Sequence, residues 1–74
     1  MSLSAEAYAE IRRLIVRVEL APGAVIREDE LRERLALGRT PIREALQALV
    51  RDQFVTVIPR RGMFVSSIDV GELG

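Results

Sequence analysis

The chain opens with a segment in which apolar residues recur at helical spacing, while charged side chains take the opposite face. The apolar stripe consists of Tyr8, Ile11, Leu14, Ile15 and Val18. Ser4 is suited to cap the start of this helix. The pattern stops at Ala21-Pro22-Gly23, because proline disfavours helical backbone in the residue before it. We therefore predict an amphipathic helix that starts near Ser4 and ends before this turn.

A second, shorter helix is predicted from Arg27 to Leu35, after an extended piece at Val25-Ile26. Leu31 and Leu35 lie four residues apart, which places them on one face. The acids of its first turn precede Arg32 and Arg34, an order that the helix dipole favours. The acids that cluster on this helix are Glu28, Asp29, Glu30 and Glu33. Since no histidine accompanies them, we interpret them as part of the helix rather than as a hydrolytic or metal site.

A third helix follows a tight turn at residues 36–38. Its apolar stripe consists of Ile42, Ala45, Leu46, Leu49 and Val50. Two starts remain open. Thr40 followed by Pro41 forms a cap-and-proline signal, whereas Gly38 as the cap would place Pro41 inside the first turn, where proline is tolerated. The helix is expected to end by Gln53.

Two strands and a turn complete the pattern. Residues 54–58 are rich in β-branched and aromatic side chains, and Met63-Phe64-Val65 resumes that character after the turn at residues 59–62. The sequence therefore predicts a β-hairpin. The fold class is α+β, mainly α, with three helices followed by a hairpin wing.

One domain is the most that 74 residues support, because a chain of this length builds one small core. We place that domain at residues 4–66. Residues 1–3 fit no pattern and are interpreted as an expression leader. Residues 67–74 are predicted to begin a linker to a further C-terminal effector domain.

The residue types that the chain lacks exclude several classes of function. The chain has no cysteine and no histidine, which removes thiol chemistry, the commonest general base and most transition-metal ligands. We therefore expect neither an enzyme nor a cofactor. No apolar run is long enough to span a membrane and no secretory signal is present, so a cytoplasmic location is expected.

The formal net charge is zero, but the charge is unevenly distributed. Residues 39–64 contain five arginines against two acids, a surplus of +3, whereas residues 1–38 contain six arginines and seven acids. A local basic surplus of this kind suits contact with a nucleic acid.

Two helices joined by a tight turn, preceded by a helix and followed by a hairpin, form the winged helix-turn-helix arrangement. In it the last helix enters the DNA major groove, so its polar face carries the candidate contacts. That face consists of Arg39, Arg43, Gln47 and Arg51, with Thr40 and Glu44 beside them. A charged outer face is also normal for any amphipathic helix. The basic hairpin tip at Arg60-Arg61-Gly62, which suits a DNA backbone or minor groove, favours the DNA interpretation.

The same residues resemble the N-terminal domain of the GntR family of transcription regulators. The most specific part is Arg39-Thr40-Pro41-Ile42-Arg43-Glu44-Ala45-Leu46, supported by Leu20-Ala21-Pro22-Gly23 and by Arg61-Gly62-Met63-Phe64-Val65. The resemblance covers residues 8 to 65. Val25-Ile26-Arg27-Glu28 and the Pro-Arg-Arg-Gly wing resemble the FadR-like (FCD) branch, which has an all-helical C-terminal ligand domain.

The resemblance implies that Arg39, Thr40 and Arg43 contact operator phosphates and bases, and that Gly62 lies near the minor groove. Gln47 is added from helix geometry. Two positions depart from the family pattern. Gly38 stands where a serine or threonine is usual, so a hydroxyl contact is missing, and Asp29 stands where some FadR-like members have a DNA-contacting arginine.

The expected function is sequence-specific binding of double-stranded operator DNA by a bacterial transcription regulator. In the intact protein the resemblance implies a homodimer on a pseudo-palindromic site, controlled by a small-molecule effector. The alternative from another class is a winged helix that contacts only proteins, which the neutral overall charge would suit.

Overall fold

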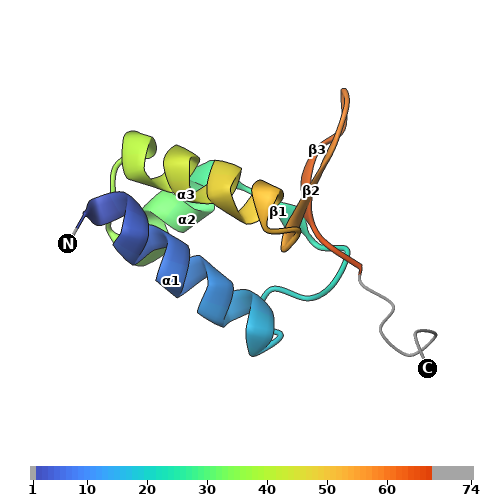
Figure 1. Cartoon of the computed structure of the whole chain (residues 1–74), viewed down its shortest axis with the longest axis horizontal. Coiled ribbons are helices and arrows are strands. Elements are labelled where there is room, and N and C mark those ends of the chain that lie inside the picture. Colours follow the sequence, from blue (N-terminus) through green and yellow to red (C-terminus); the bar gives the residue numbers. More distant parts are fainter. Residues whose placement is uncertain (1, 68–74) are drawn as a thin grey trace.

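The computed structural model describes residues 2–67, which form three helices and one small antiparallel sheet (Figure 1). In chain order the elements are α1 (Leu3–Val16), β1 (Val25–Ile26), α2 (Glu28–Leu35), α3 (Arg39–Arg51), β2 (Val55–Ile58) and β3 (Gly62–Val65). The helices pack together, and the hairpin of β2 and β3 projects away from them beyond the end of α3. This arrangement confirms the predicted winged helix-turn-helix fold.

The start of α1 differs from the prediction. Ser2 is the N-cap, because its Oγ accepts a hydrogen bond from the backbone N–H of Ala5 at 3.1 Å. The predicted cap at Ser4 is therefore wrong, and Leu3 lies inside the helix. Leu3 is 57% exposed and adds little to the core. The interpretation of residues 1–3 as a leader stays a prediction.

The end of α1 also comes earlier than its apolar pattern predicts. Val18, which was expected on the buried face, is exposed and has a left-handed φ of 61°. Its backbone N–H donates to the carbonyl of Ile15 at 3.0 Å. The N–H of Glu19 donates to the carbonyl of Leu14 at 2.9 Å. These two bonds form the Schellman pattern of a helix C-terminus, so α1 stops at this turn rather than at the proline.

The turn between α2 and α3 decides between the two predicted starts of α3. Ala36 has a left-handed φ of 57° and ends α2, and Gly38, in extended conformation, is the N-cap of α3. Pro41 consequently lies in the first turn of α3, where its missing N–H has no helical partner to lose. α3 then continues to Arg51, with Asp52 as its C-cap.

The sheet contains the predicted hairpin and one further strand. β2 and β3 pair from Val55 with Val65 to Ile58 with Gly62. β1 pairs with the other edge of β3, with Val25 opposite Phe64, which gives the strand order β1-β3-β2. The sequence indicated an extended piece at β1 but not its pairing. This third strand ties the base of the wing to the helices.

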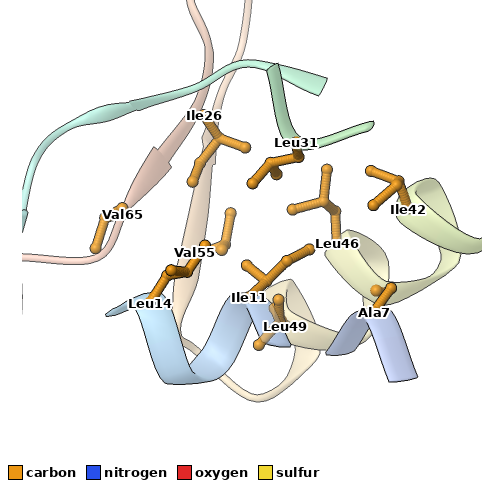
Figure 2. Close-up of a cluster of buried hydrophobic side chains, with 11 residues drawn as sticks. Ala7, Ile11, Leu14, Ile26, Leu31, Ile42, Leu46, Leu49, Val55 and Val65 are labelled. Carbon is orange, nitrogen blue, oxygen red and sulfur yellow. The ribbon is translucent and has the colours of Figure 1, made fainter. Parts of the chain in front are cut away.

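A single cluster of buried apolar side chains holds these elements together. Figure 2 shows side chains from the three helices and from the strands pointing toward one another. The cluster consists of Ala7, Ile11, Leu14, Ile26, Leu31, Ile42, Ala45, Leu46, Leu49, Val55 and Val65. The four apolar positions predicted for α3 from Ile42 to Leu49 are thus confirmed as buried. None of the helices in residues 2–67 combines the length and apolar character needed to cross a membrane.

Candidate nucleic-acid interface

α3 has one buried and one exposed face, and the candidate DNA contacts lie on the exposed face. Arg39, Thr40, Arg43 and Gln47 are all exposed, opposite the core residues of the same helix. The side chains of Arg39 and Arg43 are 61% and 58% exposed. Gly38 caps the helix through its backbone alone, and the first turn contains no acid. The start of α3 therefore presents arginines and unpaired backbone N–H groups together, an arrangement suited to anions.

Arg39 and Arg43 share one carboxylate, that of Glu28 at the first residue of α2. The Nε–H of Arg43 donates to Oε1 of Glu28 at 2.9 Å. Nε of Arg39 lies 3.6 Å from Oε2 of the same side chain. The Glu28 side chain is 28% exposed and is therefore more covered than either arginine. The sequence did not reveal this contact, because Glu28 precedes the arginines by 11 and 15 positions and only the packing of α2 against α3 joins them.

The tip of the wing is a tight basic turn. The backbone N–H of Arg61 donates to the carbonyl of Ile58 at 2.9 Å, which closes a four-residue turn over Pro59 and Arg60. Arg60 has φ of +67°. Proline in the second position and a positive φ in the third match a type II turn. Arg60 and Arg61 are exposed, and neither forms an ion pair with a residue in the range 2–67.

Gly62 follows this turn as the first residue of β3. Its φ is +115°, a conformation that side chains with a Cβ rarely adopt, although no atom would obstruct a Cβ there. Glycine is therefore needed at this position for the backbone path rather than for space. The effect is to return the chain sharply into β3 and to leave the two arginines at the tip.

A groove of about 400 Å³ connects α3 to the wing. Its lining residues are Ile26, Glu28, Arg43, Leu46, Gln47 and Met63. Arg43 and Gln47 come from α3, and Met63 from β3, so the predicted helix face and the wing border the same depression. Arg51, the last member of the predicted row, is separated from this group. It lines a different groove between α3 and α1, beside Tyr8.

The two departures from the expected family pattern have clear structural positions. Gly38 forms no side-chain cap, and nothing lies within 4 Å of the place where its Cβ would be. Asp29 is exposed in the first turn of α2, where its Oδ1 accepts the backbone N–H of Glu30 at 3.0 Å. A serine at position 38 would therefore fit without steric conflict, and Asp29 is engaged with its own helix.

Comparison with known proteins identifies the family. Residues 3–65 match the family model described as bacterial regulatory proteins, gntR family. The chain belongs to this family. An uncharacterized HTH-type transcriptional regulator in an unstable DNA locus of Streptomyces ambofaciens is 42% identical over 62 residues, which are 84% of this chain and 26% of that protein.

Two solved structures have the same fold as this chain. A transcriptional regulator GntR from Rhodococcus sp. RHA1 has a TM-score of 0.81 and 30% identity, over 89% of this chain and 32% of that one. The N-terminal domain of AraR, in a crystal structure with mutant ORR3, has a TM-score of 0.75 and 27% identity. That match covers 89% of this chain and 96% of the AraR chain.

These matches define which part of a GntR regulator the chain represents. The chain spans 26% of the Streptomyces protein and 32% of the Rhodococcus protein. It corresponds to their helix-turn-helix part and is the DNA-binding domain of a GntR-family transcription regulator. The family consists of transcription regulators, a class that is generally not enzymatic.

Proposed function

We propose that this domain binds double-stranded DNA with α3 in the major groove and the wing tip against the adjacent minor groove. The observation that carries the proposal is that the outward residues of α3 and strand β3 of the wing border one groove. The major groove is about 12 Å wide and admits one helix, so α3 enters it with its exposed face toward the bases. The projecting hairpin then reaches the next stretch of backbone.

The individual contacts follow from the chemistry of each side chain. Arg39 and Arg43 suit guanine edges and phosphates, because the guanidinium group has a planar set of donors. Gln47 suits adenine, and the Thr40 hydroxyl suits a phosphate oxygen. Arg60 and Arg61, with Gly62 shaping the turn, suit the backbone along the minor groove.

The intact protein extends this function beyond the domain. We infer that it is a cytoplasmic regulator of the FadR-like (FCD) branch, which binds its operator as a homodimer and responds to a small-molecule effector through a C-terminal domain. The partial coverage of longer relatives supports a further domain. A two-fold dimer would place two copies of α3 in successive major grooves, about one helical turn apart.

The test is a shift titration of the domain with a pool of random duplexes at several salt concentrations. We expect weak binding that falls steeply with added salt, because phosphate contacts release counterions. Arg39→Ala or Arg43→Ala should each cost about 1–3 kcal/mol on a selected duplex, whereas Arg60→Ala or Arg61→Ala should each lower the salt slope by about one unit.

Arg17→Ala is the matched control, because it removes the same charge from the exposed C-terminal end of α1. Unaltered affinity for both the Arg39 and the Arg43 variants would refute the assigned face. Absence of any duplex binding would favour the alternative of a winged helix that contacts proteins, which the zero net charge suits.

A further inference from the structure

The shared contact of Glu28 with Arg39 and Arg43 restricts how these arginines can bind DNA. Both contacts use Nε: Arg43 donates a hydrogen bond of 2.9 Å, and Arg39 forms an ion pair at 3.6 Å. Because these contacts use Nε, the edge formed by the two terminal nitrogens of each guanidinium group stays available to other acceptors. A guanidinium group held in this way presents one edge, formed by Nη1 and Nη2, to whatever approaches α3.

We propose that Glu28 is a positioning residue that makes Arg39 and Arg43 read guanine through their Nη1 and Nη2 edge. Guanine offers two acceptors in the major groove, O6 and N7, and the terminal edge of arginine can donate one bond to each. This inference rests on the proposed binding of α3 in the major groove. It adds that a residue of α2, which need not touch DNA, determines the base preference of α3.

The surroundings of Glu28 hold its carboxylate in place beside the two arginines. It is the first residue of α2, where the helix dipole favours a negative charge. It is largely covered, and it lines a groove with Ile26, Leu46 and Met63, so water screens its attraction to the arginines less than at an open surface. A free arginine, in contrast, would lose rotamer entropy when it binds a base.

The proposal predicts opposite effects on selective and unselective binding. A carboxylate near the duplex weakens attraction to every phosphate, whatever the sequence. Ordered arginine edges strengthen binding most where guanine is present, because its O6 and N7 accept one bond each. Removal of Glu28 should therefore leave binding to unrelated duplexes equal or tighter, while binding to the preferred duplex weakens.

The experiment first selects a preferred duplex from a random library with the unaltered chain. The affinities for that duplex and for a scrambled one are then measured for the unaltered chain, Glu28→Ala and Glu28→Gln. We expect Glu28→Ala to reduce the ratio of the two affinities about tenfold, the low end of what a bidentate contact is worth. Glu28→Gln should retain an intermediate ratio, because its amide oxygen can still accept one Nε–H.

Glu33→Ala is the matched control. It removes the same charge from the same helix, and Glu33 is exposed and has no ion pair within residues 2–67. This variant should bind both duplexes slightly more tightly and leave the ratio of the two affinities unchanged. Replacing guanine by 7-deazaguanine in the selected duplex removes N7. This change should weaken binding by the unaltered chain much more than binding by Glu28→Ala.

Two results would overturn the role of Glu28. The first is an unchanged affinity ratio in Glu28→Ala and Glu28→Gln, with both folded by circular dichroism. Equal tightening of binding to both duplexes is one form of this result, and would mean that Glu28 only weakens the attraction to phosphates. The second is a selected duplex whose binding by the unaltered chain is not weakened by 7-deazaguanine. Failure of the unaltered chain to bind any duplex would instead overturn the proposed function, and this inference with it.

Discussion

At the scale of single residues, Tyr8 illustrates how one polar contact can connect two helices outside the core. Its Oη donates a hydrogen bond to Oδ2 of Asp52, the C-cap of α3, at 2.5 Å. This bond, partial burial and the negative charge of Asp52 together raise the pKa of Tyr8 above its ordinary value of 10.0. The contact therefore joins α1 to the end of α3 most strongly while the phenol is protonated.

An alkaline titration tests this contact directly, because Tyr8 is the only tyrosine of the chain. We expect the tyrosinate absorbance to rise with a midpoint above 10.0 and to move back toward that value in Asp52→Ala. The raised folded pKa means that the stabilisation is complete below pH 10 and is lost as the pH rises through the folded pKa.

The stability of Tyr8→Phe gives the matching measurement. Urea unfolding at neutral pH should show a loss of about 1 kcal/mol, the usual net value of one hydrogen bond. In this variant the additional loss of stability above pH 10 should disappear. A tyrosinate midpoint at or below 10.0 in the folded, unaltered chain would contradict the assignment.

Which residue contacts could be predicted depends on how far apart the partners lie in sequence. The outward direction of Arg39 and Arg43 follows from the period of one helix, and the structure confirms it. Tyr8 and Asp52 are 44 positions apart. Their contact depends on how two helices cross, which local periodicity does not contain. The pairing of Glu28 with both arginines was missed for the same reason.

At the scale of elements, the helix bodies were predictable and several helix ends were not. Apolar periodicity located all three helices, since each buries one stripe. The turns after α1 and α3 pass through Val18 and Gln53, both with positive φ. Glycine is the usual signal for such an end. Because valine and glutamine carry no such signal, the end of α1 was predicted too late. β1 has only two residues, too few to show a strand period.

The wing turn yields a prediction in which stability and binding change in opposite directions. Arg60 has φ of +67°, which costs an ordinary residue about 1–2 kcal/mol, whereas asparagine tolerates this conformation better. Arg60→Asn should therefore raise the free energy of unfolding by about 0.5–1 kcal/mol. The same change removes a cation, so the salt slope for random duplex should fall by about one unit.

Arg61→Asn serves as the control for this prediction, because it removes the same charge from a neighbouring residue that has no positive φ. Thermal unfolding should show no gain of stability in this variant, while the salt slope should fall as in Arg60→Asn. Equal melting temperatures for the two variants would mean that the turn at Arg60 carries no strain worth relieving.

At the scale of the whole molecule, stability depends on one small core. Eleven residues from the helices and strands form a single cluster (Figure 2). A domain of this length is expected to have a total stability of about 4–11 kcal/mol. Removing a large buried side chain costs about 2–5 kcal/mol. One core substitution can therefore remove much of the free energy of unfolding. It also disturbs the helices and the base of the wing together.

Leu49→Ala tests this dependence and its connection with DNA binding. Leu49 is fully buried on α3, so the variant should lose about 2–5 kcal/mol in urea unfolding, whereas Leu3→Ala, at an exposed position of α1, should lose little.

Binding of duplex to the folded state alone adds about 2.7 kcal/mol when the duplex is at 100 times its dissociation constant. Random duplex at low salt should therefore raise the melting temperature of Leu49→Ala, and high salt should abolish that gain. If Leu49→Ala melts like the unaltered chain, the single cluster does not control the fold. If duplex leaves its melting temperature unchanged at low salt, DNA does not bind preferentially to the folded domain.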